Sequence, residues 1–240
     1  VSWIGSMFEY LMPNLFTRTY PETLLDQTSQ GVVAAQIKYA RKNDVPWGIS
    51  ESSYYRFDQA ENYQYKGFGV PQLGRKRGLA DELVIAPYAS LLAVGVQPQA
   101  VLENIKELEE IGALSHYGFY ESIDYTTSRL PVGKDKAIVK TYMAHHQGMI
   151  LVALANFLIE DSITNRVHAD PRIQSTELLL QEQIPEAGSI KKTKEVQVVG
   201  RGAQAKGISV APWNVHDEKP GKSVHVISNG NLRLLATESG

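Results

Sequence analysis

Apolar residues recur at helical spacing through most of residues 1–184, and this recurrence predicts a mainly helical domain. The clearest stretch is 23–42, where Leu24, Val32 and Ile37 recur near the helical period and Arg41 and Lys42 favour the C-terminal end. Further helices are predicted over 6–18 with a kink or break at Pro13, over 81–94, over 98–111, over 137–159 and over 171–183.

These helices differ in how their apolar positions are distributed. Residues 81–94 are apolar almost all round, as in a buried helix, whereas 98–111 shows one apolar face and one charged face. Buried and amphipathic helices in alternation favour two concentric layers, as in an α/α toroid. An irregular helical bundle is also compatible with the spacing.

Two long segments, 43–80 and 115–136, lack any period and are predicted to be loops. The first holds seven aromatic residues, which weigh against disorder. Long irregular segments within compact domains usually serve function.

The composition of the chain changes after Pro185. Residues 185–222 are rich in Gly, Ala, Lys and Pro and are predicted to be a linker, with VQVV as at most a short strand. Residues 223–240 alternate around Asn229-Gly230, a strand–turn–strand pattern. One hairpin cannot stand alone, so we expect it to begin a second, β-rich domain after a first domain over 1–184. The chain starts at Val1 inside domain-like sequence, so we expect it to be a piece of a longer protein.

Charge and composition exclude several classes of protein. The chain has 240 residues, with 24 Lys plus Arg against 26 Asp plus Glu, and this net charge of −2 argues against a nucleic-acid partner. It has no cysteine, which excludes disulfides and thiolate chemistry. The longest apolar run, 149–159, is too short to cross a bilayer, so we expect no membrane insertion of this segment.

The densest group of candidate chemical residues lies within 46–71. Glu51 is surrounded by small residues and is flanked by Trp47, Tyr54 and Tyr55. Carboxylates and aromatic rings in an irregular cleft are typical of glycoside cleavage, in which two acids flank the scissile bond. The alternative interpretation is that these rings simply close the core of a tyrosine-rich loop.

Other acidic residues compete with Glu51. Glu9 is a charge in an apolar stretch, for which structural pairing is the favoured interpretation. Glu121 and Asp124 either line the same cleft or cap the next element. Asp81 and Glu82 are interpreted as acids at a helix N-terminus.

His145, His146 and Gln147 raise the possibility of a metal site. Adjacent histidines on a helix point about 100° apart, so both cannot readily bind one ion. We expect one histidine to face a cleft and donate to a sugar hydroxyl, with the other in the core. The sequence contains no HExxH, phosphate-loop or GxSxG motif, and His168 is interpreted as a loop contact. No metal and no cofactor are predicted.

Seven motifs in order carry a family resemblance: SMFEYLMP, YPETLLDQ, VPWGISES, YQYKGFGVPQLGRKRGLADELVIAPYAS, YGFYESIDYTTSRLP, TYMAHHQGM and HADPRIQSTELLLQE. Over roughly 2–184 the chain resembles the glucoamylase-like domain of cyclic β-1,2-glucan synthases. The resemblance implies an all-α fold, an incomplete (α/α)6 toroid of the six-hairpin glycosidase type. The terminal VHVISNGNLRLLATESG resembles the first hairpin of the β-sandwich in the phosphorylase-like module of those synthases.

The resemblance also implies an activity and a location. It implies a retaining transglycosylase that acts on β-1,2-glucan, within a large protein of the bacterial inner membrane that also holds a glycosyltransferase. This segment is expected to be soluble, on the cytoplasmic side, with the glucan and the remaining domains as its partners. The alternatives are a β-1,2-glucan hydrolase on the same scaffold and a non-catalytic glucan-binding module.

Site residues follow from matching positions. Glu51 matches the nucleophile, whereas the acid/base glutamate of the family lies upstream of this chain, so we expect the segment to be inactive alone. In isolation it should expose apolar surface, and it should either be poorly soluble or associate with the missing half. Ile4 replaces a residue that is usually small. The candidate substrate-binding residues are Glu9, Trp47, Tyr54, Tyr55, Tyr63, Tyr65, Glu121, Arg129, His146 and Gln147.

Overall fold

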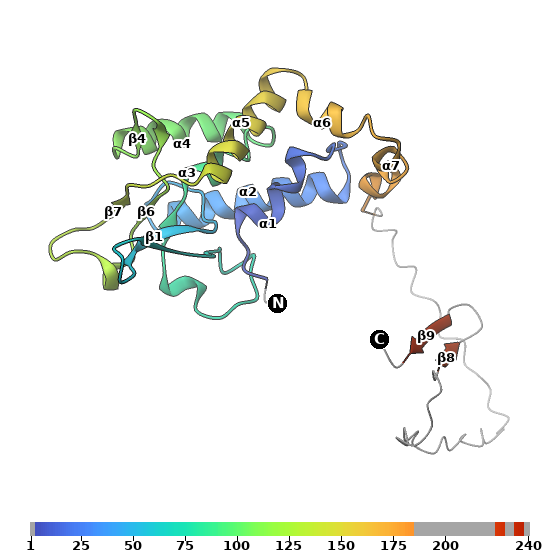
Figure 1. Cartoon of the computed structure of the whole chain (residues 1–240), viewed down its shortest axis with the longest axis horizontal. Helices are drawn as coiled ribbons and strands as arrows, with labels where there is room; N and C mark the ends of the chain where they lie inside the picture. Colours follow the sequence, from blue (N-terminus) through green and yellow to red (C-terminus); the bar gives the residue numbers. More distant parts are fainter. Residues whose placement is uncertain (1–2, 185–223, 229–232, 238–240) are drawn as a thin grey trace, which may run out of the picture. The chain divides into compact units, whose positions relative to one another are not determined.

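The computed structural model describes residues 3–184, 224–228 and 233–237. The chain divides into two compact units, 1–188 and 189–240, which are described separately (Figure 1). The helices of the first unit are α1 (Met7–Leu11), α2 (Leu24–Lys42), α3 (Pro87–Leu91), α4 (Pro98–Glu110), α5 (Ala144–Leu158), α6 (Ser162–Val167) and α7 (Pro171–Gln174), with 3-10 turns η1 (Pro13–Leu15), η2 (Leu79–Asp81), η3 (Thr127–Arg129) and η4 (Glu177–Gln181).

The predictions for 6–18, 23–42 and 98–111 are confirmed, and the end signals explain why. Thr23 caps α2 by accepting a hydrogen bond from the backbone N–H of Asp26, and Pro98 occupies the first turn of α4. The first predicted helix breaks as expected, because α1 ends at Leu11 and η1 begins at Pro13.

Two of the predicted buried helices are wrong in their first halves. Within 81–94, β3 (Val84–Ile85) precedes α3, and within 137–159, β7 (Ala137–Val139) precedes α5. Together with β6 (Ser122–Asp124) they form an antiparallel sheet in the order β3-β6-β7. A short strand that is buried on both faces is apolar at every position, so its sequence does not differ from that of a buried helix.

The two aperiodic segments also contain strands. In 43–80, β1 (Ser52–Phe57) pairs antiparallel with β2 (Tyr63–Lys66), and Ser53 lies opposite Tyr65. In 115–136 and just before it, β4 (Leu114–Ser115) pairs with β5 (Gly118–Phe119). β1, β6 and β7 lie side by side in Figure 1, at the left of the view. The prediction of plain loops is therefore wrong here.

The last predicted helix of the first unit, 171–183, is interrupted after Gln174. The hydroxyls of Ser175 and Thr176 bond preceding backbone carbonyls, an arrangement that competes with helix continuation. Leu178 and Leu179 are 80% and 75% exposed, so the prediction that they face a core is wrong.

The core of the first unit joins its helices to its sheet. Met7 and Leu11 of α1, Val33 of α2 and Ile123 of β6 are all fully buried, so α1 and α2 pack in one cluster with the strands. The mainly helical class is thus confirmed, whereas a concentric two-layer arrangement stays a prediction. Among the described residues, none of the helices has the length and apolar character needed to cross a bilayer.

In the second unit, β8 (Val224–Ser228) pairs antiparallel with β9 (Arg233–Thr237), as the alternation predicts. The predicted linker 185–222, its VQVV segment and the turn at Asn229-Gly230 lie outside the described residues. That this hairpin begins a β-sandwich stays a prediction.

Candidate active site

Two buried amide side chains hold the segment that leads to Glu51. Gln36 of α2 donates to the carbonyl of Ile49 and accepts from its N–H, both at 2.9 Å. Asn104 of α4 bonds the N–H and carbonyl of Trp47 in the same reciprocal way, also at 2.9 Å. Each side-chain amide therefore makes the two hydrogen bonds that a neighbouring β-strand would make to one residue. These bonds satisfy the buried backbone N–H and carbonyl groups of Trp47 and Ile49.

The next residues are fixed by α1 and α3. The hydroxyl of Tyr88 is shared between Ser50 Oγ at 2.9 Å and the carbonyl oxygen of Glu51 at 3.0 Å. The N–H of Phe8 also donates to Ser50 Oγ, at 3.1 Å. Gly48 adopts φ +130°, and a Cβ there would lie 3.0 Å from the carbonyl oxygen of Ala86, so the close approach requires glycine. The backbone that leads to and carries Glu51 is thus supported from four helices, α1, α2, α3 and α4.

The side chain of Glu51 is half-buried. Its burial raises the pKa of the carboxyl, and the negative charge of Glu9 adds to this rise, which only a protonated His146 would oppose. Glu51 therefore lies neither in bulk solvent nor behind packed leucines. Partial desolvation thus favours the protonated form of this carboxyl more than in an exposed one.

Glu9 has the structural role that the sequence favours. Its carboxylate accepts hydrogen bonds from the backbone N–H groups of Ile4, Gly5 and Ser6, at 3.1, 2.7 and 2.9 Å. Ser6 completes a capping box at the start of α1. Glu9 also acts on the candidate site, because its negative charge raises the pKa of Glu51 beyond the effect of burial.

Glu121, His146 and Tyr65 form a connected chain next to Glu51. Glu121 Oε1 accepts from the N–H of Ser53 at 3.1 Å, and Oε2 lies 3.0 Å from His146 Nδ1. His146 Nε2 lies 3.3 Å from the hydroxyl of Tyr65, and the ring of Tyr88 stacks on His146 with centroids 3.7 Å apart. The buried histidine is therefore His146, with no exposed surface, whereas His145 is exposed.

The predicted aromatic wall divides into three parts. Trp47 and Tyr54 are buried in the core, 6% and 7% exposed, as in the alternative interpretation of a loop that closes a core. Tyr55 and Tyr63 are half-buried and contact each other in a cluster with Phe57 on the β1–β2 hairpin. Tyr65 is 39% exposed, and its ring stacks against His146 with centroids 6.0 Å apart.

Arg129 is engaged by protein groups. Its guanidinium pairs with Asp124 at 2.9 Å and with Glu82, and it also donates to Thr126. Burial alone would raise the pKa of Glu82, but hydrogen bonds from Lys66 and Arg129 lower it. Glu82 is therefore an ion-pair residue and does not start a helix, which corrects the sequence interpretation. Asp81 ends the 3-10 turn η2.

The remaining predicted residues have defined partners. Gln147 donates to the carbonyl of Phe119 at 3.2 Å. Asp124 is fully buried and accepts from the N–H of Tyr55 at 3.0 Å. His168, directly after α6, is a loop contact as predicted, and it is buried: Nε2 accepts from the N–H of Arg18, and Nδ1 lies 2.5 Å from Glu177.

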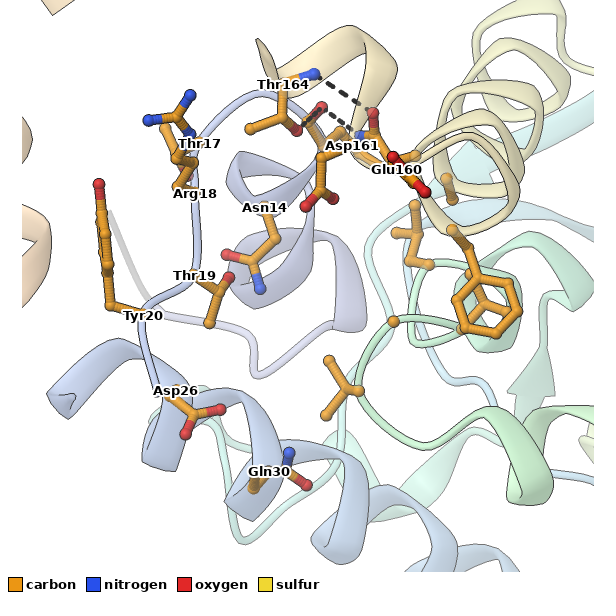
Figure 2. A pocket seen from close by; sticks show the side chains of 18 residues that line it. Asn14, Thr17, Arg18, Thr19, Tyr20, Asp26, Gln30, Glu160, Asp161 and Thr164 are labelled. Atoms are coloured by element: carbon orange, nitrogen blue, oxygen red, sulfur yellow. Dashed lines mark hydrogen bonds between the residues drawn. The ribbon is translucent and has the colours of Figure 1, made fainter. Parts of the chain in front are cut away.

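A separate hollow of about 450 Å³ lies elsewhere in the first unit, between the first half of α2, the C-terminal end of α5 and the start of α6 (Figure 2). Several of its polar side chains are bonded to protein: Asn14 to Ser29, Arg18 to Glu177 and Asn165. None of the predicted site residues lines it. The hollow is therefore distinct from the Glu51 region.

Family comparison places this arrangement among known proteins. The family model described as "Glycoamylase: Putative glucoamylase" matches residues 1–171. The chain belongs to this glucoamylase-like family. Cyclic beta-(1,2)-glucan synthase NdvB of Rhizobium meliloti strain 1021 is 42% identical over the whole chain, and the chain spans only 8% of that relative's length.

Two solved structures share the fold of the glucoamylase-like chain. A protein from Bacteroides uniformis, described in the same words as the family, matches with a TM-score of 0.52 and 19% identity, covering 74% of this chain and 41% of its own. The endo-beta-1,2-glucanase of Chitinophaga pinensis, solved with sophorotriose and glucose, matches with a TM-score of 0.52 and 18% identity, covering 75% and 42%.

Sequence reasoning missed the residues that support the site. Gln36, Asn104 and Tyr88 are 0%, 2% and 2% exposed, and each bonds backbone of the segment 47–51. The available signal was weak: a polar side chain at an apolar position of a helix. Such a residue is buried only with a partner, but the sequence does not identify that partner.

Proposed function

We propose that this glucoamylase-like chain supplies a catalytic carboxylate, Glu51, to an enzyme that cleaves and transfers β-1,2-glucan. The observation that carries the proposal is the environment of Glu51: a rigid backbone, a half-buried carboxyl with a raised pKa, and a partly exposed tyrosine beside it. We choose β-1,2-glucan as the substrate because it stands in the names of the related synthase and glucanase.

The proposed chemistry is a double displacement. A carboxylate attacks the anomeric carbon of a glucosyl unit while a second carboxylic acid protonates the leaving oxygen, and the C1–O bond to the leaving sugar breaks. A glucosyl-enzyme results. A sugar hydroxyl then attacks C1 and its proton passes to the second group. The ester bond between C1 and the enzyme breaks, which releases the carboxylate, and a new β-1,2 bond forms. If the acceptor hydroxyl belongs to the same chain, the product is cyclic.

Glu51 fits either of the two carboxyl roles. The family resemblance assigns it the nucleophile, which must be ionised. The raised pKa of Glu51 instead favours the acid/base role, because burial stabilises the protonated form. The two roles predict different products in a chemical rescue experiment, described below.

The wider setting is also part of the proposal. The chain would work as one domain of a membrane-associated glucan synthase, with the remaining domains supplying the linear glucan. Hydrolysis on the same scaffold differs only in the second step, where water replaces the sugar hydroxyl. A non-catalytic binding module would retain glucan binding without turnover in any variant.

The first test is Glu51→Gln in the full-length protein. We expect the transfer rate on β-1,2-glucan to fall by roughly 10²–10⁴-fold, since an amide can neither ionise nor donate an acidic proton. Glu109→Gln is the matched control, because Glu109 is exposed on α4, away from the 47–51 segment. Unchanged turnover in Glu51→Gln would remove this residue from the mechanism.

Azide rescue of Glu51→Ala assigns the role. If Glu51 is the nucleophile, azide attacks the β-glycoside directly and gives an α-glucosyl azide. If Glu51 is the acid/base, azide attacks the glucosyl-enzyme and gives a β-glucosyl azide. The anomeric configuration of the wild-type product separately tests retention, since an inverting enzyme would give the opposite anomer.

A further inference from the structure

The hydrogen bonds of His146 are restricted by what surrounds the ring. The side chain has no exposed surface, and Tyr88 stacks on it at an interplanar angle of 12°. Tyr88 therefore covers this face of the ring, and only the two ring nitrogens are left for hydrogen bonds. As a neutral imidazole, His146 has one N–H donor and one bare nitrogen acceptor.

Glu121 determines which nitrogen carries the proton. Its Oε1 is occupied by the N–H of Ser53, and its Oε2 lies 3.0 Å from His146 Nδ1. An ionised carboxylate only accepts hydrogen bonds, so Nδ1 must be the donor. Nε2 is then bare and accepts from the hydroxyl of Tyr65, 3.3 Å away.

The hydroxyl of Tyr65 has a fixed direction as a result. Its proton points to His146, so its oxygen lone pairs are left for another donor. Tyr65 is 39% exposed, so this oxygen can meet a ligand, and the negative charge of Glu51 acts on the Tyr65 hydroxyl. We propose that Glu121 and His146 orient Tyr65 as a hydrogen-bond acceptor for a hydroxyl of the sugar bound beside Glu51. This inference rests on the proposed function for its ligand, a neutral polyol.

Glu121 and His146 are positioning residues in this proposal, and Tyr65 is the residue that touches the sugar. A phenol oxygen that accepts favours a ligand rich in O–H donors over one that offers only acceptors. The preference comes from two buried groups that do not touch the ligand.

The variant Glu121→Gln should reverse the chain of hydrogen bonds. The backbone N–H of Ser53 must still be accepted, so the amide oxygen of Gln faces Ser53 and its NH₂ faces His146 Nδ1. Nδ1 then becomes the acceptor, the proton moves to Nε2, and Tyr65 receives a hydrogen bond where it formerly donated one. Its own O–H proton then points away from His146.

The first readout is ¹⁵N NMR of the histidine side chains. The chain has six histidines, and loss of one signal set in His146→Gln assigns the ring of interest. We expect a protonated Nδ1 and a bare Nε2 in the wild type, and the reverse in Glu121→Gln. An imidazolium in the wild type, or an unchanged tautomer in Glu121→Gln, would overturn the proposal. A merely structural role for Glu121 would not move the tautomer.

The second readout is binding of a short β-1,2-linked glucan by calorimetry, in a Glu51→Gln background that prevents turnover. Loss of one hydrogen bond to a sugar hydroxyl in Tyr65→Phe should weaken binding roughly 5- to 10-fold. Tyr117→Phe is the control, since Tyr117 is 77% exposed and lies outside this chain of contacts. Unchanged binding in Tyr65→Phe would overturn the sugar contact.

The two readouts separate this inference from the proposed function. If the wild-type protein neither binds nor turns over the glucan, the proposed function fails. The NMR pattern still decides whether Glu121 sets the tautomer of His146.

Discussion

Arg129 is the residue that holds two acidic side chains in place. Its side chain is 12% exposed and pairs with the fully buried Asp124 and with Glu82. Asp124 in turn accepts from the backbone N–H of Tyr55, so the ion pair supports the strand that follows Glu51.

We expect Arg129→Met to lower the free energy of unfolding by about 3 kcal/mol, because it leaves a carboxylate buried without its partner. Urea denaturation followed by circular dichroism measures this. The control is Arg172→Met, since the pair between Arg172 and Asp170 is solvent-exposed and should contribute little. Equal effects of the two substitutions would contradict this view of Arg129.

Glu51 should make stability depend on pH. Its pKa is raised in the folded state, so its contribution to stability is fully present below the unfolded value near 4.5 and is lost as pH rises through the folded pKa. Glu51→Gln should therefore be more stable than the wild type at pH 7, and the difference should disappear below about pH 4. Thermal unfolding across pH 3–8 measures it, and a gap that widens on acidification would exclude a raised pKa.

Secondary-structure elements with strong end signals were predictable, and buried short ones were not. α2 has a Thr cap and a basic C-terminal end, and α4 has Pro at its first turn. β3 and β7 are two and three residues long and are extended because β6 lies between them, which is a contact over long sequence distance. Local periodicity carries no information on such a partner.

Two glycines test how elements pack. Gly31 lies inside α2 with no atom within 4 Å of an added Cβ, so Gly31→Ala should stabilise the protein by about 0.5–1 kcal/mol. A Cβ on Gly69 would lie 2.0 Å from the carbonyl oxygen of Ile4, so Gly69→Ala should destabilise it by about 1–3 kcal/mol. Melting temperatures of both variants give the comparison, and shifts of the same sign would refute it.

At the scale of the whole molecule, the position of Glu51 between small and aromatic residues could be predicted, but the direction of each ring could not. Tyr54 turns inward and Tyr65 remains partly exposed because a strand alternates its side chains and its register depends on the partner strand. Trp47, before β1, is buried where Asn104 bonds its backbone. The sequence also does not tell which of His145 and His146 is buried, because this depends on the packing of α5 against α3.

Large apolar side chains are exposed at the C-terminal half of α5. Leu151 and Leu158 are 68% and 72% exposed, and Ile159, directly after the helix, is 63% exposed. Such a patch binds apolar dyes and favours association. We expect the double variant Leu151→Gln, Leu158→Gln to bind less anilinonaphthalene sulfonate and to elute later in size-exclusion chromatography. Val132→Gln, at a fully exposed loop position, should change neither, and dye binding that persists in the double variant would place the patch elsewhere.

Gln36 links the middle of α2 to the peptide of Ile49, two residues before Glu51. A rigid-body tilt of α2 would consequently displace the backbone next to Glu51, since both hydrogen bonds of one amide side chain join this helix to Ile49. Substitutions on the solvent face of α2 leave this link intact, whereas a change in the tilt or rotation of the helix would move the Glu51 carboxyl without touching it.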